Sequence, residues 1–339
     1  MNALDDRNKA AQVSLSKELL ASVSRSFSLS LRALPAAVRP ALELGYLLAR
    51  ASDTLADTVG VPVSGRAACL EEYCGVLFEG GASDCLTGMI EEAFLPRQSH
   101  AGERELLRRL PECLLWLDRR PPREQDELRA VLKEITRGQL EDCVRGGEPG
   151  RVVWLESAEE LDRYTYLVAG SVGRFWTRIA DLHLSGWRSQ SVLPDEEMTA
   201  CGIRFGKALQ LVNILRDLPA DLRAGRGYLP RNEVREAGGW GERAMDGIPE
   251  GNAMTSVARR WERRAQEWLE DGRRYAGALR SRRMRLATVL PLRLGEETLA
   301  LLSRAGWEER AKGIKISRRR VRRILAVETV RSFATVWRG

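Results

Sequence analysis

Apolar residues recur every three or four positions along nearly the whole chain, and no segment alternates apolar and polar residues over the length of a strand. This period is typical of amphipathic helices, so the pattern predicts an all-α protein whose helices pack around a central apolar cavity. The expected helices are residues 15–31, 43–58, 64–78, a segment that includes residues 106–114, then 124–145, 158–182, 194–225, 254–279 and 282–305.

Three residues are expected to shape the ends and bends of these helices. Ser64 follows a turn and should be the N-cap of the helix that ends near residue 78. Pro219 removes a helical hydrogen bond and should end or kink its helix, so the helical spacing argument does not extend to Asp221, for which a turn is the alternative. Pro291 is expected to kink the last long helix for the same reason.

The size of the chain is sufficient for one large core. With 339 residues and 44% hydrophobic content, we predict a single domain over residues 1–339. No apolar run approaches the roughly 18 residues of a membrane-spanning helix, and the first residues (MNALDDRNKAAQ) lack the pattern of a secretory signal. We therefore expect a cytoplasmic protein.

The cysteines and histidines argue against two kinds of site. The six cysteines show no CxxC spacing, and the chain has two histidines, His100 and His183. A zinc site, or a nucleophile activated by histidine, is therefore not expected. Most of the cysteines lie in apolar helical contexts, which predicts reduced and buried thiols.

The chain is basic, with a net charge of +7 and with six lysines against 48 arginines. Guanidinium groups bind phosphates through paired hydrogen bonds, although solvated helix faces are also rich in arginine. The basic run from Lys312 to Arg323 (KGIKISRRRVRR) is expected to be a solvated face or a surface that contacts an anionic membrane. No aromatic residues interleave with this charge, so nucleic-acid binding is not expected.

Polar residues recur at helical spacing in two of the expected helices. Asp53 and Asp57 are four residues apart in one, and Asn213 and Asp217 are four apart in the other, so each pair shares a helix face. The neighbours of Asp53 and Asp57 are mostly apolar, and buried carboxylates are costly unless cations compensate them. Because Mg²⁺ takes oxygen ligands, the pattern predicts Mg²⁺ ions that bridge these pairs to a diphosphate. Arginines near these pairs would contact the remaining phosphate oxygens. They are Arg50, Arg216 and Arg226.

Five motifs resemble, in order and spacing, those of the squalene/phytoene synthase family. They are Ser24-Arg25-Ser26-Phe27, Tyr46-x₃-Arg50-x₂-Asp53-x₃-Asp57, Tyr164-x₃-Val168-Ala169-Gly170-x₂-Gly173, Gln210-x₂-Asn213-x₂-Arg216-Asp217-x₃-Asp221 and Arg226-Gly227-Tyr228-Leu229-Pro230. The resemblance covers the chain from about residue 15 to about residue 325. It implies an isoprenoid synthase fold, a single helical bundle that joins two prenyl diphosphates head to head with Mg²⁺.

The resemblance also implies roles for single residues. The metal–diphosphate clusters would be held by Asp53, Asp57, Asn213, Asp217 and Asp221, and the four aspartates would be catalytic in this sense. The diphosphate and substrate sites would be lined by Ser24, Ser26, Tyr46, Arg50, Gln210, Arg216, Arg226 and Tyr228. Tyr164 matches a tyrosine that assists catalysis beside the departing diphosphate, where the phenol or the diphosphate itself would accept a proton.

The expected reaction condenses two farnesyl diphosphates through presqualene diphosphate and then uses NADPH to form squalene. The motif Asp53-Thr54-Leu55-x-Asp57 resembles the corresponding motif of squalene-forming members more than that of carotenoid-forming ones. A contact with the phosphate of a nicotinamide cofactor is another interpretation of the Lys312 run, because squalene-forming relatives have a basic segment near it. Carotenoid-forming relatives also have basic residues in this region, so the run does not decide the product. The alternatives are a phytoene or dehydrosqualene synthase that needs no reductant, a non-catalytic scaffold relative, and a head-to-tail prenyl transferase, whose DDxxD cluster is absent. The protein would be cytoplasmic, or peripheral at the inner face of a membrane.

Overall fold

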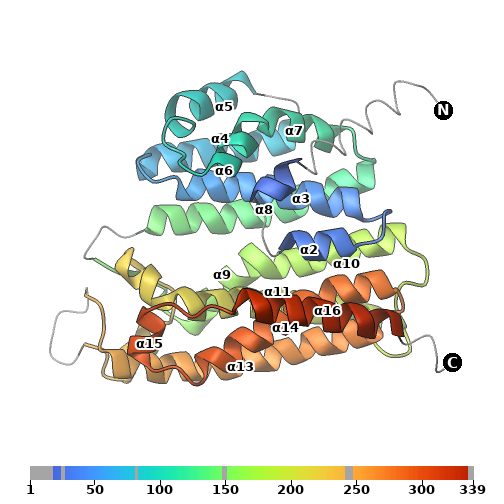
Figure 1. The fold of residues 1–339 in the computed structure, drawn as a ribbon. Helices are drawn as coiled ribbons and strands as arrows, with labels where there is room; N and C mark the ends of the chain where they lie inside the picture. The colour runs from blue at the N-terminus through green and yellow to red at the C-terminus, as the bar shows by residue number, and fades with distance from the viewer. Residues whose placement is uncertain (1–17, 24–26, 81–82, 147–150, 241–246, 335–339) are drawn as a thin grey trace, which may run out of the picture. The chain divides into compact units, whose positions relative to one another are not determined.

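The computed structural model describes residues 18–23, 27–80, 83–146, 151–240 and 247–334. Most of these residues are helical and very few are in strands, which confirms the predicted all-α class (Figure 1). Contacts between residues divide the chain into two compact units, and each is described by itself. The first unit comprises residues 1–144 and 178–185, and the second comprises residues 145–177 and 186–339. The expectation of a single domain stays a prediction.

The first unit consists of helices. Its elements are α2 (Phe27–Ala33), α3 (Arg39–Asp57), α4 (Val63–Glu79), α5 (Asp84–Met89), the π-helix η1 (Ile90–Phe94), α6 (Ala101–Arg108), α7 (Leu110–Asp118) and most of α8 (Pro122–Arg145). The helix α3 contacts α2, α4, α6 and α7, and therefore carries much of the packing of this unit.

The helix α3 buries one face and leaves a polar stripe on the other. Leu44, Leu47, Leu48 and Ala51 are each 0% exposed, as their helical spacing predicts. Burial of one leucine side chain contributes roughly 1.5–3 kcal/mol. The hydroxyl of the buried Tyr73, in α4, donates a hydrogen bond of 3.0 Å to the carbonyl of Leu48. These contacts fix the rotation of α3, and therefore the direction of its polar stripe.

Two helix boundaries in this unit differ from the prediction. The helix α4 begins at Val63 with Pro62 as its N-cap residue and without a side-chain capping bond, so the expectation that Ser64 is the N-cap was wrong. The leucine-rich segment around residues 106–114 forms two helices rather than one, with Arg109 between them. Pro111 lies in the first turn of α7, where its missing N–H cannot continue the hydrogen bonds of α6.

The second unit contains the remaining helices and two short strands. Its elements are β1 (Val153–Trp154), α9 (Ala158–Thr165), the π-helix η2 (Tyr166–Gly170), the first half of α10 (Ser171–His183), α11 (Asp195–Arg223), β2 (Arg226–Gly227), α12 (Arg231–Glu236), α13 (Gly251–Ala278), α14 (Arg282–Leu302), α15 (Trp307–Ala311) and α16 (Arg318–Ala334). The helix α11 packs against α13, α14, α9 and η2. The expected helix 158–182 is thus interrupted by η2, and α14 runs through Pro291.

Glycines allow α11 to approach the η2–α10 segment closely. A Cβ added to Gly173 would lie 1.9 Å from the carbonyl oxygen of Gly202, and one added to Gly206 would lie 2.2 Å from that of Ala169. Only glycine fits at such distances, which offsets its cost inside a helix of about 1 kcal/mol relative to alanine. The η2–α10 segment is therefore held against α11 by backbone-to-backbone contact.

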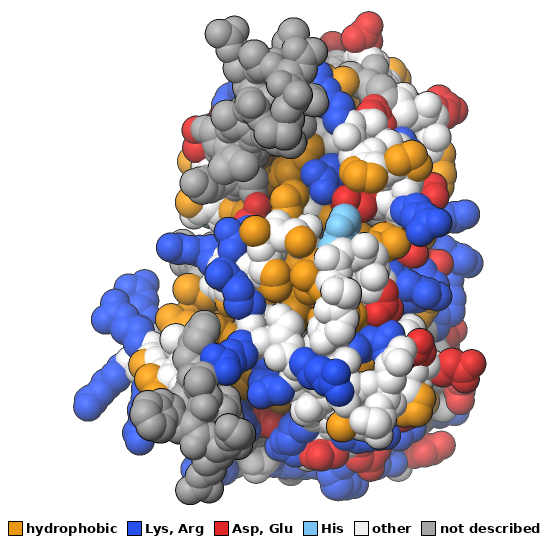
Figure 2. Space-filling model, turned by 90° about the vertical axis from the view of Figure 1, so that its right-hand side faces the viewer, with side chains coloured by type: hydrophobic (Ala, Val, Ile, Leu, Met, Phe, Trp, Pro, Cys, Tyr) orange, Lys and Arg blue, Asp and Glu red, His pale blue; other side chains and the backbone are white. Residues whose placement is uncertain are grey.

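The surface of the chain reflects its charge. On the face drawn in Figure 2, blue Lys and Arg side chains are spread widely, with fewer red carboxylates among them, in keeping with the net charge of +7. Among the helices that the structure describes, none combines the length and the apolar character needed to cross a membrane.

Candidate functional site

A row of polar side chains runs along α11 in the second unit. Gln210, Asn213, Asp217 and Asp221 are spaced by three or four residues, so they share one face of the helix. Asn213 is exposed, and the other three are half-buried. The flanking residues Leu211, Ile214, Leu215 and Leu218 are buried in the core of the unit. The apolar contacts of α11 therefore orient this polar face.

Pro219 does not end its helix, which was one of the two outcomes expected for it. The helix continues to Arg223, so Asp221 lies on the same helix as Asp217 and not in a turn. Pro219 is buried, and Leu218 and Leu222 beside it pack into the core. A proline costs one helical hydrogen bond, and tertiary packing of this kind can hold the helix together in spite of that loss. The polar face of α11 is consequently one turn longer than the sequence predicted.

Each carboxylate of this face is paired with an arginine. The Nε and Nη2 of Arg216 donate hydrogen bonds of 2.9 and 2.6 Å to the two oxygens of Asp217. This hydrogen bonding raises the pKa of Arg216 above its ordinary value, although burial lowers it. The Nη2 of Arg226 lies 3.2 Å from Oδ1 of Asp221, whose side chain is 15% exposed. The face thus carries fixed cations next to its anions.

A glycine turn and the strand pair position Arg226. Gly225 has a φ of +81°, which a residue with a side chain rarely adopts, and it reverses the chain directly after α11. The strands β1 and β2 are parallel, with Val153 opposite Arg226 and Trp154 opposite Gly227. A Cβ added to Gly227 would lie 2.4 Å from the ring of Trp154, so glycine is required there too. The helical pattern did not predict these strands.

Two tyrosines from distant parts of the sequence stack beside this turn. Tyr164 lies near the end of α9 and Tyr228 follows β2, and their ring centroids are 5.1 Å apart with 23° between the planes. The guanidinium of Arg145, the last residue of α8, lies 5.7 Å from the centroid of Tyr164 and 5.5 Å from that of Tyr228. Arg145 was not predicted to belong to the site, because nothing in its local sequence indicates this long-range contact.

In the first unit, the polar stripe of α3 carries a second group of charges. The Nη1 of Arg50 lies 2.6 Å from Oδ2 of Asp53, and its Nη2 pairs with Glu103 of α6. Burial lowers the pKa of Arg50, but the negative charges of Asp53 and Glu103 outweigh this effect, so the pKa is raised. Glu103 is a member of this group that the sequence did not reveal.

The structure also corrects the expectation that the carboxylates of Asp53 and Asp57 are buried. These carboxylates were expected to be buried, whereas the side chain of Asp53 is 40% exposed and Asp57 is exposed. Only their neighbours on the other face of α3 are buried, so the cost of burying charge does not apply to them. The hydroxyl of Tyr46, on the same stripe, donates to the carbonyl of Val23 at 3.5 Å. Ser24 and Ser26 lie outside the described residues.

The predicted site residues therefore fall into two groups. The second unit holds Tyr164, Gln210, Asn213, Arg216, Asp217, Asp221, Arg226 and Tyr228. The first unit holds Tyr46, Arg50, Asp53 and Asp57. Within each unit, the structure brings the arginines and the aspartates into direct contact.

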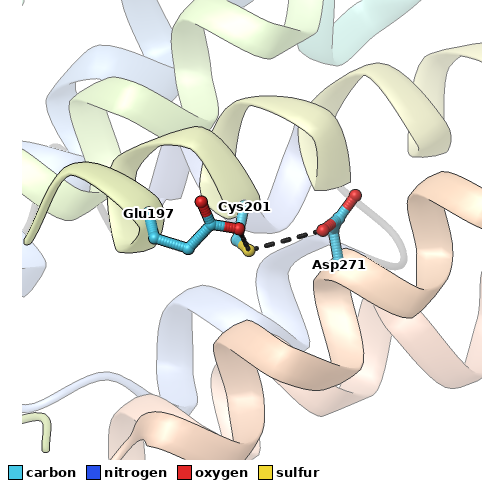
Figure 3. Close-up of side chains that lie close together, drawn as sticks. All are labelled: Glu197, Cys201 and Asp271. Atoms are coloured by element: carbon cyan, nitrogen blue, oxygen red, sulfur yellow. Dashed lines mark hydrogen bonds between the residues drawn. The ribbon is translucent and has the colours of Figure 1, made fainter. Parts of the chain in front are cut away.

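A separate group of side chains in the second unit has the spacing of a metal site. The ligand atoms of Glu197, Cys201 and Asp271 lie within 4.8 Å of one another, which no other three such residues do in the described part of the chain. Figure 3 shows Cys201 between the two carboxylates, with its Sγ 3.8 Å from Glu197 and 3.4 Å from Asp271. None of the predicted metal ligands belongs to this group.

Arginines already neutralise this group. The Nε of Arg204 lies 2.7 Å from Asp271, and the Nη1 of Arg274 lies 2.9 Å from Glu197 and 3.1 Å from Asp271. Burial, with the charge of Asp271, raises the pKa of Cys201 to about 12, so the thiol is protonated near neutral pH. These contacts form a salt-bridge network between α11 and α13 in which the two carboxylates are already paired with arginines.

Comparison with known proteins places this arrangement in a family. The family model described as Squalene/phytoene synthase matches residues 20–320, and the chain belongs to this family. The match includes both the stripe of α3 and the polar face of α11. The resemblance inferred from the five motifs is therefore confirmed.

Curated relatives include enzymes of two kinds. The chain is 34% identical over 116 residues to phytoene synthase 1, chloroplastic, of Zea mays, covering 34% of this chain and 27% of the relative. It is 25% identical over 220 residues to squalene synthase ERG9 of Saccharomyces cerevisiae, covering 63% of this chain and 44% of the relative. The chain thus spans less than half the length of these two relatives.

Solved structures support the fold. A structure of TcSQS with a bound ligand superposes with a TM-score of 0.73 and 21% identity, covering 94% of this chain and 86% of that one. At this identity the likeness establishes the fold alone, which is the isoprenoid synthase fold expected from the motifs.

Proposed function

We propose that this protein is a Mg²⁺-dependent prenyltransferase that condenses two farnesyl diphosphates head to head. The product of this first step is presqualene diphosphate, which NADPH then reduces to squalene. The observation that carries the proposal is the face of α11, where Asn213, Asp217 and Asp221 lie in one row with Arg216 and Arg226 paired to the two carboxylates. Membership of the Squalene/phytoene synthase family supports it.

The donor atoms on this face fit Mg²⁺. They are the carboxylate oxygens of Asp217 and Asp221 and the amide oxygen of Asn213, and Mg²⁺ prefers oxygen ligands. The side chain of Asp217 is 48% exposed, so it is accessible to a metal–diphosphate complex. Asp53 and Asp57 offer a second oxygen pair on α3, and these also have exposed surface. Bound Mg²⁺ would neutralise the diphosphate as the allylic C–O bond ionises.

The arginines would bind the diphosphate oxygens. Arg50, Arg216 and Arg226 are each held by an aspartate, so their guanidinium groups are already oriented next to the proposed metal ligands. A guanidinium donates paired hydrogen bonds to phosphate oxygens in the same way as to carboxylates. In each unit, the charges that stabilise one another without substrate would therefore be available to bind diphosphate oxygens.

Tyr164 would act next to the departing diphosphate. Its ring stacks on that of Tyr228, and Tyr228 follows the proposed diphosphate ligand Arg226 by two residues in the chain. We propose that Tyr164 assists proton transfer as the cyclopropane closes, with the released diphosphate as the other acceptor. Gln210, Tyr46, Tyr228, Ser24 and Ser26 would contribute to substrate binding.

A second candidate function follows from the relatives. The chain matches a phytoene synthase as well as a squalene synthase, so the same ionisation without a reductive step is the alternative. Such an enzyme would form phytoene from geranylgeranyl diphosphate, or dehydrosqualene from farnesyl diphosphate, and would need no NADPH. A non-catalytic scaffold role is less favoured, because both aspartate pairs are present.

The products distinguish these functions. The purified protein should be incubated with Mg²⁺ and either farnesyl or geranylgeranyl diphosphate, with and without NADPH, and the products identified by mass spectrometry. We expect presqualene diphosphate without NADPH and squalene with it. A product that is the same with and without NADPH would exclude the reductive step and favour the second candidate. A monocyclic or longer linear product would instead favour a cyclase or a head-to-tail transferase.

A further inference from the structure

A buried lysine of α11 reaches the short helix α9. The Nζ of Lys207 donates a hydrogen bond to Oδ1 of Asp162, and the Lys207 side chain is 11% exposed whereas that of Asp162 is 52% exposed. The same Nζ lies 4.5 Å from the ring centroid of Trp268, a buried residue of α13. A buried cation is costly unless it is paired, and the face of an aromatic ring adds attraction. One lysine therefore links α9, α11 and α13.

The stem of this lysine lies in space that a glycine leaves open. A Cβ added to Gly170, the last residue of η2, would lie 2.9 Å from Cγ of Lys207. Any side chain at Gly170 would therefore crowd the lysine stem. Lys207 thus contacts both η2 and α9, which are the two segments that precede α10.

The helix α9 needs such contacts to hold its position. It has eight residues, and isolated helices of this length are marginal in water. The π-helix η2 follows it directly and interrupts the α-helical hydrogen-bond pattern, so α9 is not a regular extension of α10. Side chains of α9 must therefore fix it against the unit, and they include the buried Leu161 and the bond from Asp162 to Lys207.

Both members of the pair adjoin residues of the proposed site. Asp162 precedes Tyr164 by two residues on α9. Lys207 precedes Gln210 by three residues on α11, so these two lie about one turn apart on the same side of that helix. A displacement of α9 relative to α11 would move the phenol of Tyr164 relative to the polar face. A misplacement of about 1 Å can lower a rate about a hundredfold.

We propose that Lys207 is a positioning residue for Tyr164. Its ammonium group holds Asp162, and thereby α9, in one position relative to the polar face of α11. The inference rests on the function proposed above, in which the phenol of Tyr164 assists proton transfer. Because Lys207 acts through Asp162 and not on the substrate, its loss lowers kcat and leaves KM nearly unchanged.

The kinetic test compares Lys207→Met and Asp162→Asn with the wild type in the Mg²⁺-dependent release of diphosphate. We expect each variant to lower kcat about tenfold, with KM changed less than about twofold. Methionine keeps an unbranched stem and Asp162 is half exposed, so both variants should fold, which thermal unfolding checks. Asp162→Glu keeps the carboxylate and should recover part of kcat. The control Lys133→Met removes a lysine that lies over the ring of Phe78 in the first unit, and should react as the wild type does.

A double variant separates positioning from a general structural role. Tyr164→Phe already lacks the hydroxyl that Lys207 is proposed to position, so adding Lys207→Met should lower kcat by less than about twofold further. If the two losses multiply in full, Lys207 does not act through Tyr164 and the proposal is wrong. A wild-type kcat in Lys207→Met, or a rise in KM alone, would also contradict it.

Hydrogen exchange tests the same link without any reaction. In Lys207→Met the amides of α9 should exchange about tenfold faster than in the wild type, whereas those around the buried Leu215 of α11 should keep their rate. Unchanged exchange in α9 would overturn the proposal. If the wild type releases no diphosphate, the proposed function fails, but exchange in α9 still decides whether Lys207 holds this helix. The two failures are therefore distinguishable.

Discussion

Tyr164 and Tyr228 stack face to face at 5.1 Å although they lie far apart in the sequence, and the guanidinium of Arg145 lies over both rings. Tyr164 reaches this position from the end of α9, and Tyr228 reaches it from the turn that follows α11. Arg226 of the same turn pairs with Asp221. The stack therefore connects the proposed catalytic phenol to the residues proposed to bind the diphosphate.

The two tyrosines should respond differently to loss of the hydroxyl. We expect Tyr164→Phe to keep the stacked ring but to lower kcat by about a hundredfold or more, because general acid–base catalysis contributes on this scale. Tyr228→Phe should change kcat only several-fold, since its ring alone supports the stack. Steady-state kinetics of diphosphate release measure both effects. Equal losses in the two variants would show that Tyr164 has no special role.

Arg145 should act as a positioning residue for this pair. Each cation–π contact contributes about 0.5–1 kcal/mol, so Arg145→Ala is expected to lower kcat about tenfold with little change in KM. Arg145→Lys keeps the cation and should recover part of the loss, which a purely structural role of the side chain would not predict. A rise in KM without a change in kcat would instead indicate direct binding of substrate by Arg145.

The buried pair Arg310–Glu262 should dominate the stability of the second unit's C-terminal part. The side chain of Arg310 is 0% exposed and that of Glu262 is 8% exposed, and Arg310 also donates to the carbonyl of Leu302 at the end of α14, at 2.8 Å. Glu262→Ala would leave a buried cation unpaired, which costs about 3–5 kcal/mol. The control is Glu267→Ala, because Glu267 is 64% exposed and pairs only at the surface with Arg264.

Urea unfolding measures this difference. The control should lower the free energy of unfolding by less than about 1 kcal/mol. If both variants lose the same stability, the buried pair has no special importance. Glu262→Gln, which retains a hydrogen-bond acceptor, should fall between the two.

The thiols should show a pH dependence that follows their burial. Burial is the main cause that raises the pKa of Cys69, Cys113 and Cys201 to about 12 in each case. A raised thiol pKa leaves the unreactive protonated form in excess until the pH approaches about 12. At pH 8 we therefore expect iodoacetamide to modify the exposed Cys85 first, and these three thiols only after unfolding.

Mass spectrometry of peptides checks this order. In Cys85→Ser the fast phase of labelling should disappear. Rapid modification of Cys201 in the folded protein would contradict the protonated thiol between Glu197 and Asp271, and would reopen the possibility of a thiolate at that position.

The periodicity of the sequence predicted the parts of the site that depend on helix faces. The apolar spacing of Leu44, Leu47 and Leu48 determines which face of α3 is buried. The position of Arg50 and Asp53 on the opposite face of this helix was therefore predictable. The same holds for Asn213 and Asp217 on α11. In both cases the local pattern and the tertiary contacts agree.

The features that the sequence analysis missed or mispredicted depend on contacts between distant segments of the chain. Arg145 and Glu103 join the proposed site through partners on other helices, which spacing within one helix does not reveal. Pro219 was expected to end or kink α11, but it does not end the helix, and the residues on both sides of it are buried. The exposure of Asp53 was also mispredicted, because apolar neighbours in sequence lie on the opposite helix face.

The central claim is that the aspartates of α11 hold the metal and diphosphate, and the most direct test is the Mg²⁺-dependent release of diphosphate from farnesyl and geranylgeranyl diphosphates. The wild type should release diphosphate only with Mg²⁺. Asp217→Asn should reduce the rate by about a hundredfold or more without lowering thermal stability, because several kcal/mol of charge stabilisation are lost. Asp126→Asn, at an exposed position of α8, should react as the wild type does. Release by Asp217→Asn at the wild-type rate and with the same Mg²⁺ dependence would contradict the claim.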